Sequence, residues 1–232
     1  MFFSFQFRFK NYSADAAFTF TDSAITATGE GSGYEIDGTH ITIEAAGTYL
    51  LSGDEYPDNG SAENAVIKCK DGSQVTICGT GTLNITANGK NGIKSGATTD
   101  EEGEASLIIK ELTLNISAPV NDAINAQQLL SIESGTLSIA AGDDAVHSDL
   151  VLNIGSEGTE GPTISIAGCC EGLEAAELNV LSGDITILSS DDCMNAANSD
   201  LGNYDFVINI SGGTVVVWTA RRKYGRYAAS IR

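Results

Sequence analysis

The sequence predicts an all-β fold, a single-stranded parallel β-helix (solenoid). Three observations support this prediction: many glycines with few prolines, short apolar pairs at a spacing of two residues, and recurrence of these pairs in blocks of 21–31 residues. Of the 232 residues, 26 are glycine and 3 are proline, which indicates many tight turns. No segment sustains the 3.6-residue period of an amphipathic helix.

Two kinds of apolar pair alternate along the chain, and in each pair residues i and i+2 make one face of a short strand apolar. The first kind occurs at Val75/Ile77, Leu107/Ile109, Leu130/Ile132, Leu152/Ile154, Leu178/Val180 and Ile208/Ile210. The second kind occurs at Leu83/Ile85, Leu114/Ile116, Leu137/Ile139, Ile164/Ile166, Ile185/Ile187 and Val215/Val217. Turns that usually contain glycine separate the two kinds, so each repeat predicts two strands.

A third anchor of the form polar, small, aliphatic follows the second strand of each repeat. Its six copies begin at Asn64, Asn91, Asp122, Asp144, Glu171 and Asp192. Two strands and one anchor per repeat predict a three-sided coil whose open apolar face only the next coil can cover. A β-sandwich is the alternative fold, but it requires hairpin turns at shorter and less regular spacing.

The repeat predicts one β-helix domain over residues 18–219, between two atypical segments. Residues 1–17 alternate phenylalanine with polar residues, which indicates a strand that caps the core and shows no secretory signal. Residues 220–232 hold five of the twelve basic residues and match neither a coil nor a cap. The repeat gives no indication of self-association, and we expect a monomer.

The charge distribution restricts the possible partners. The formal net charge is −19, and residues 111–220 contain sixteen acids but no Lys or Arg. Such a surface excludes nucleic acid as a direct partner and disfavours an anionic membrane surface. No apolar run is long enough to span a membrane. The five cysteines show no CxxC pair, so a zinc site is not expected.

Stacking of the coils would place the anchors' first residues in one column, about 4.8 Å apart. In the last four coils they are preceded by Asn121, Asp143, Cys170 and Asp191. Stacked carboxylates repel unless a cation bridges them, and Ca²⁺ binds oxygen ligands at about 2.3–2.6 Å. The pairs Asp143/Asp144 and Asp191/Asp192 are therefore candidate calcium ligands, with Asn121, Asp122, Glu171 and Glu174 near by.

Two plainer interpretations remain open for this column. The acids could form a merely soluble acidic surface, and Asn64 and Asn91 could form a ladder of stacked side-chain amides. For the paired acids a metal is favoured, because ionised carboxylates cannot form such a ladder. The candidate carbohydrate contacts beside the acids are Asn121, His147, Glu174 and Asn195.

Catalysis has weaker support, and we assign no catalytic residues. Elimination from a uronate needs a strong base such as Arg or Lys near calcium, and the acidic region has neither. Hydrolysis needs two carboxylates, one with a raised pKa, and the Asp pairs could supply them. However, the His and Arg/Lys motifs of polygalacturonase-like hydrolases are absent. His147 could be a ligand or an acid/base, but a lone surface histidine is more often neither.

Seven motifs occur in order along the chain: HITIEAAGTYLLSG (40–53), NGIKSGATTDEEGEASL (91–107), NDAINA (121–126), DDAVHS (143–148), EGLEAAELNV (171–180), DDCMNAANSD (191–200) and NISGGTVVVW (209–218). Through these motifs the chain resembles, from about Phe18 to Trp218, the bacterial carbohydrate-binding domain-containing family of secreted β-helix proteins, which bind cellulose and acidic sugars such as polygalacturonate.

The resemblance implies a right-handed β-helix and non-catalytic binding of an acidic polysaccharide such as pectin, with cellulose as a second candidate ligand, outside the cell or on a bacterial surface. It also implies Ca²⁺ at acidic corners, with the candidate ligands Asp122, Asp143, Asp144, Glu171, Asp191 and Asp192. The alternatives are a β-helix polysaccharide lyase or hydrolase, and a structural adhesin of the cell surface whose calcium only stiffens the stack.

Overall fold

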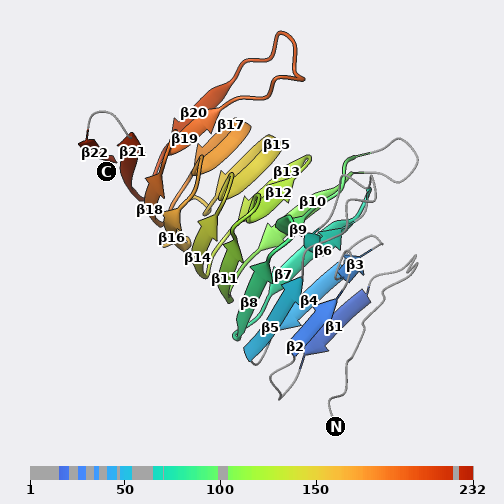
Figure 1. Cartoon of the computed structure of the whole chain (residues 1–232). Helices are drawn as coiled ribbons and strands as arrows, with labels where there is room; N and C mark the ends of the chain where they lie inside the picture. The colour runs from blue at the N-terminus through green and yellow to red at the C-terminus, as the bar shows by residue number, and fades with distance from the viewer. Residues whose placement is uncertain are drawn as a thin grey trace.

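A computed structural model describes the backbone of residues 16–20, 26–29, 34–36, 41–45, 48–53, 65–69, 71–98, 104–221 and 225–231. Side chains are described within residues 65–69, 71–98 and 104–219. These ranges contain strands but no helix, and therefore no helix that could cross a membrane. The strands stack as a parallel β-solenoid, which confirms the predicted fold class (Figure 1).

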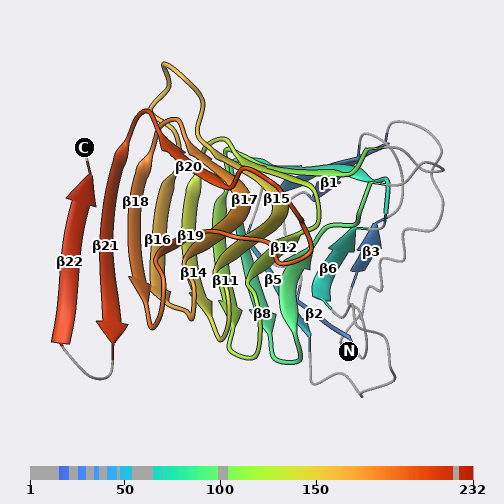
Figure 2. The same cartoon turned by 90° about the horizontal axis from the view of Figure 1, so that it is seen from above.

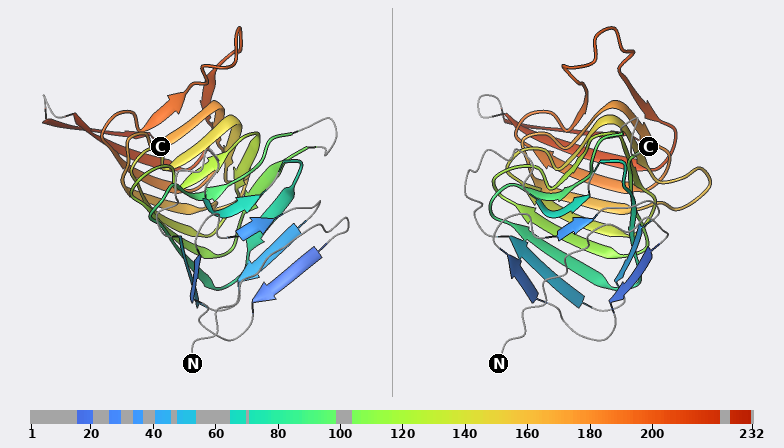
Figure 3. Two further views of the ribbon diagram at one scale, coloured as in Figure 1. Left: turned by 45° about the vertical axis from the view of Figure 1, so that its right-hand side comes forward. Right: turned by 90° about the vertical axis from the view of Figure 1, so that its right-hand side faces the viewer.

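Each coil has three sides, and every side is one face of the stack (Figures 1 and 3). The first face stacks β1 (Ala16–Phe20), β4 (Ile41–Ala45), β7 (Gln74–Cys78), β10 (Ser106–Ile109), β13 (Leu129–Ile132), the C-terminal parts of β15 (Val146–Ile154) and β17 (Leu173–Val180), and β20 (Val207–Ile210).

The second face stacks β2 (Thr26–Gly29), β5 (Thr48–Gly53), β8 (Thr82–Ala87), β11 (Thr113–Ala118), β14 (Thr136–Ala141), β16 (Thr163–Gly168), β18 (Asp184–Ser189), β21 (Thr214–Arg221) and β22 (Gly225–Ile231). The third face stacks β3 (Tyr34–Ile36), β6 (Ala65–Cys69), β9 (Asn91–Lys94), β12 (Ile124–Ala126), the N-terminal parts of β15 and β17, and β19 (Met194–Ala196).

The predicted apolar pairs stack in register through the core. On the first face Leu107 pairs with both Val75 and Leu130, and on the second face Leu114 pairs with both Leu83 and Leu137. Leu107 and Leu114 have no exposed surface, because the coils above and below cover them. The hydrophobic effect of burying these aliphatic side chains in every coil stabilises the stacking of one coil on the next.

The third anchor also stacks as predicted, from Ile93 through Ile124, Val146 and Leu173 to Met194. The copy predicted to begin at Asn64 is wrong by one residue, because Ala65 lies in register with Asn91, and Ile67 with Ile93. Val66 and Ile67 are both aliphatic and buried, so the polar-small-aliphatic pattern could not distinguish the two registers. Asn64 itself lies outside the described residues.

The two ends of the stack differ in how far they are described. Residues 1–15 lie outside the described ranges, so the predicted capping strand of phenylalanines falls there. Within residues 220–232, β22 runs antiparallel to β21 and extends the second face by one strand (Figure 2). The remaining described strand pairs are parallel.

Candidate functional site

The predicted column of acids lies along one corner of the solenoid, where the second face turns into the third. Backbone hydrogen bonds tie its coils together: Ala123 N donates to Asp144 O over 3.0 Å, and Gly172 N donates to Asp192 O over 2.9 Å. We call Asp122, Asp143, Asp144, Glu171, Asp191 and Asp192 the acidic corner. Each of its coils thus projects at least one carboxylate from the same edge.

Asp122 is the most buried member, with 5% of its surface exposed. Its Oδ1 accepts a hydrogen bond from Asp144 N over 3.1 Å, and its Oδ2 accepts one from Asn125 Nδ2 over 2.6 Å. Burial raises the pKa of the Asp122 carboxyl, and the negative charge of Asp144 adds to this, whereas the hydrogen bond from Asn125 opposes it. The hydrogen bonds therefore fix the Asp122 carboxyl in position, and a positive charge near it would lower its pKa.

Asp122, Asp143 and Asp144 each offer one carboxylate oxygen, and these three oxygens lie within 4.8 Å of one another. Two oxygens bound at about 2.3–2.6 Å to one Ca²⁺ can be up to about 5 Å apart, so the three carboxylates could share one ion. Asp143 is exposed, and its pKa is raised by partial burial and by the charges of Asp144 and Glu171. A divalent cation would relieve that repulsion.

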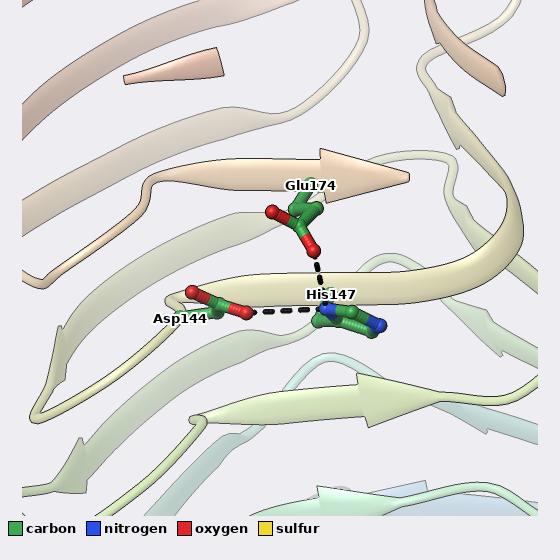
Figure 4. Close-up of side chains that lie close together, drawn as sticks. All are labelled: Asp144, His147 and Glu174. Atoms are coloured by element: carbon green, nitrogen blue, oxygen red, sulfur yellow. Dashed lines mark hydrogen bonds and ion pairs between the residues drawn. The ribbon is translucent and has the colours of Figure 1, made fainter. Parts of the chain in front are cut away.

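His147 lies on the next row of the same corner and contacts three carboxylates. Its Nδ1 is 3.1 Å from Asp144 Oδ2 and 3.4 Å from Glu174 Oε1 (Figure 4). Its Nε2 is 2.8 Å from Asp149 Oδ1. Burial by itself lowers the pKa of His147, but the hydrogen bonds with Asp144 and Asp149 outweigh burial and raise this pKa to about 10. At neutral pH, His147 is therefore an imidazolium.

A second group of possible metal ligands contains the histidine. Its members are Asp144, His147 and Glu174, and their possible ligand atoms lie within 4.8 Å of one another. Calcium prefers oxygen ligands, and a protonated ring cannot coordinate a metal. The imidazolium already provides this group with a positive charge. The Asp122, Asp143 and Asp144 triplet is consequently the better candidate for calcium.

Glu171 and Glu174 form a carboxyl pair that Asn195 bridges. Asn195 Nδ2 donates to Glu171 Oε2 over 2.9 Å and to Glu174 Oε2 over 2.8 Å. Burial and the neighbouring Glu171 raise the pKa of Glu174 to about 8, whereas the hydrogen bond with Glu174 lowers the pKa of Glu171. At neutral pH the pair mostly holds one proton and one negative charge.

A second row of polar residues runs beside the acidic corner, three positions later in each coil. Asn125, His147, Glu174 and Asn195 lie in register on adjacent strands. Donors from this row reach the acids, as Asn125 does to Asp122 and His147 to Asp144. These two bonds run within one coil, so they are not the stacked amide ladder considered for Asn64 and Asn91, and the i, i+3 spacing of D-x-x-N and D-x-x-H was the sequence signal for them.

The other predicted residues divide between the two rows and the end of the corner. Asn121 Nδ2 donates to Asn91 Oδ1, so Asn91 takes part in the predicted amide ladder. Asp191 and Asp192 are exposed and stack on the corner, but among the described residues they join no group of three possible ligands within 4.8 Å. The structure therefore brings together only three of the six predicted calcium ligands.

In comparison with known families, a family model described as carbohydrate-binding domain-containing protein matches residues 54–159. Over this segment, which is less than half of the chain, the protein is similar to a carbohydrate-binding domain family. The resemblance predicted from the motifs is thereby confirmed for these residues. Neither a search of curated proteins nor a search of solved structures gives a match. The matched segment includes Asp122, Asp143, Asp144 and His147, whereas Glu171, Asp191 and Asp192 lie beyond it.

Proposed function

We propose that this protein is a non-catalytic polysaccharide-binding module that retains an acidic plant polysaccharide, such as polygalacturonate, outside a bacterial cell. The family match over residues 54–159 supports polysaccharide binding in general. Calcium held by Asp122, Asp143 and Asp144 would bridge the protein to the carboxylates of the sugar.

The observation that carries the calcium step is the oxygen triplet of Asp122, Asp143 and Asp144, which has the spread of a single ion's ligands. The net charge of −19 makes direct contact with a polyanionic sugar unfavourable. An ion on the exposed Asp143 could keep coordination positions open toward solvent, and a uronate carboxylate could occupy them. The ion's chemistry would be electrostatic bridging, with no bond made or broken.

The test is retention of the protein on immobilised polygalacturonate in calcium and in EDTA, with the Asp143→Asn variant beside the wild type. Asp143 is exposed and its substitution leaves the core untouched, so a folding defect is not expected. We expect EDTA to release the wild type, and Asp143→Asn to weaken retention in calcium by roughly tenfold or more.

Asp184→Asn is the matched control, because Asp184 is an exposed aspartate on the second face, away from the triplet. It should bind polygalacturonate as the wild type does. Retention that EDTA leaves unchanged would reject the calcium bridge. Calcium that raises the melting temperature while no glycan binds would instead favour the structural adhesin.

The Glu171 and Glu174 pair gives one observation for a second candidate function, hydrolysis of a glycosidic bond, and one against it. The pKa of Glu174 near 8 beside the lowered pKa of Glu171 supplies one protonated and one ionised carboxyl, but the hydrogen bond between the two groups holds them closer than the roughly 5–9.5 Å at which carboxyls flank a scissile bond. Release of new reducing ends from polygalacturonate, lost in Glu174→Gln, would support the hydrolase. A constant number of reducing ends over a long incubation would reject it.

A further inference from the structure

The second face of the solenoid presents an almost uncharged surface to solvent. Strands β8, β11, β14, β16 and β18 lie side by side in this face, and along each strand buried residues alternate with outward ones (Figure 2). Among the outward side chains of these five strands, Asp184 is the only charged one, although the net charge of the chain is −19. We call the outward side of these five strands the hydroxyl face.

Hydroxyl and amide groups on the hydroxyl face stand in two rows. The first row holds Thr82, Thr113, Thr136, Thr163 and Asp184, and the second row holds Asn84, Asn115, Ser138, Ser165 and Thr186. The members of a row pair in register on neighbouring parallel strands, so they repeat about every 4.8 Å. The two rows are two residues apart along each strand, which is about 6.6 Å. The polar groups therefore form a two-dimensional array.

This array has nearly the two spacings of an ice lattice. Each oxygen in ice has four tetrahedral neighbours at a hydrogen-bond length of about 2.75 Å, so second neighbours lie about 4.5 Å apart and the hexagonal axis repeats about every 7.3 Å. Both spacings of the hydroxyl face agree with these values to within about a tenth. Over the four steps from β8 to β18 the mismatch between strands adds up to about 1.2 Å, which is less than half of one hydrogen bond.

The hydroxyls at the centre of this face are available to water. Thr136, Ser138, Thr163 and Ser165 are exposed, and within the described part of the chain their hydroxyls make no hydrogen bond to another protein group. These side chains are short, and threonine has few rotamers, so little conformational freedom is lost when a rigid surface comes to lie on them. The face thus offers donors and acceptors that are already ordered.

Three other occupants fit the hydroxyl face less well. A charged ligand would find only Asp184 to interact with, and sugar rings would find no aromatic ring on which to stack. A second copy of the chain would cover about 400 Å² of it, because the face spans five strands at about 4.8 Å and five residues at about 3.3 Å. That area is about half of what each partner of a stable complex buries.

We propose that the hydroxyl face binds the surface of an ice crystal, with Thr136, Ser138, Thr163 and Ser165 at the centre of the contact. Their hydroxyls donate to and accept from water oxygens at lattice positions, so the outermost layer of water is shared between the protein and the ice. Neither calcium nor the acidic corner takes part in this contact, and no covalent bond is made or broken.

The test is partition of the full chain, in EDTA, between liquid water and a slowly growing hemisphere of ice. We expect the wild type to be enriched in the ice and to shape single ice crystals into facets. Ser138→Lys and Ser165→Lys should each lower the enrichment at least roughly tenfold, because a lysine charge would be buried against a lattice that holds no counterion. Both serines are exposed, so the variants should keep the melting temperature of the wild type.

Ser199→Lys is the matched control, because Ser199 is an exposed serine in the loop between β19 and β20, outside the hydroxyl face. It should be enriched in ice as the wild type is. Asp184→Asn removes the one charge of the face and should be enriched at least as strongly as the wild type.

A wild type that growing ice excludes, equal enrichment of Ser138→Lys, or an equal loss in Ser199→Lys would overturn the proposal. Retention on crystalline cellulose that Ser138→Lys abolishes, without enrichment in ice, would assign the face to a polysaccharide instead. A dimer in sedimentation velocity that Ser138→Lys splits would assign it to a second copy of the chain.

Discussion

His147 Nδ1 lies 3.1 Å from Asp144 Oδ2, the carboxylate three residues before it in the same coil. The other ring nitrogen, Nε2, lies 2.8 Å from Asp149 Oδ1. Both nitrogens can donate only when the ring is protonated, so the two contacts together favour the imidazolium. One protein cation thus balances part of the acidic corner without a metal, and of the Asp122, Asp143 and Asp144 triplet only Asp144 contacts it directly.

Replacement of His147 should destabilise the fold. His147→Gln removes the positive charge between Asp144, Asp149 and Glu174, and we expect the free energy of unfolding to fall by roughly 1–3 kcal/mol at neutral pH. Urea denaturation in EDTA measures this difference, with no metal to replace the lost charge. Equal stability of the two proteins would show that the imidazolium does not hold the corner.

The contribution of His147 should also depend on pH. Its pKa is about 10 in the folded protein against an ordinary value of 6.5, so the folded state binds the proton more tightly. The stabilisation should be complete below pH 6.5 and should disappear as the pH rises through 10. The difference in unfolding free energy between wild type and His147→Gln, measured along this range, should shrink accordingly. A difference that is constant with pH contradicts the charge assignment.

Glu174 should make the protein less stable as the pH rises through neutrality. Its pKa of about 8 lies above the ordinary 4.5, so its contribution is complete below pH 4.5 and is lost by about pH 8. Thermal unfolding in EDTA should therefore show a decline over this range that Glu174→Gln reduces. Glu177→Gln, on the same strand β17 but outside the carboxyl pair, should keep the decline of the wild type.

An asparagine ladder on the first face should contribute measurably to stability. Asn179 Nδ2 donates to Asn153 Oδ1 over 3.0 Å, and Asn209 Nδ2 donates to Asn179 Oδ1 over 2.8 Å. Asn179→Ser loses both of these bonds and a third from Asn179 Nδ2 to Glu177 Oε1, and its unfolding free energy should fall by about 1–2 kcal/mol. Asn209→Ser is the control at the ladder's end, where one bond is lost from an exposed residue, and it should cost less. Equal losses would argue against the ladder.

Gly172 should not tolerate a side chain. A β carbon there would stand 2.3 Å from Cys193 O and 2.5 Å from Ile187 Cγ2, so the next coil would have to move. Gly172→Ala should lower the unfolding free energy by about 1–3 kcal/mol in urea denaturation. Gly168→Ala is the matched control, because no atom lies within 4 Å of its β carbon, and it should be neutral or slightly stabilising.

The stacking of the coils was predictable from the chain because each apolar pair joins residues two apart and the pairs recur in blocks of 21–31 residues. Leu107 and Ile109 lie in register with Val75 and Ile77 below and with Leu130 and Ile132 above. A slip of one residue would turn every such pair outward, so burial leaves one register. The same logic located the acidic corner, since a residue adjacent to a stacked anchor must itself stack.

The tertiary structure alone decided the chemistry at each corner. The pKa of His147 depends on Asp144 and Asp149, which the bend of its own coil brings to the ring, whereas Glu174 reaches the ring from the next strand only because the coils stack. The loop 155–162 is likewise held by hydrogen bonds between Ser156 and Ser182, which lie 26 residues apart in the chain. Periodicity determines which residues share a face, but electrostatic and hydrogen-bond energies depend on the separations and directions of individual atoms, which become defined when the coils pack.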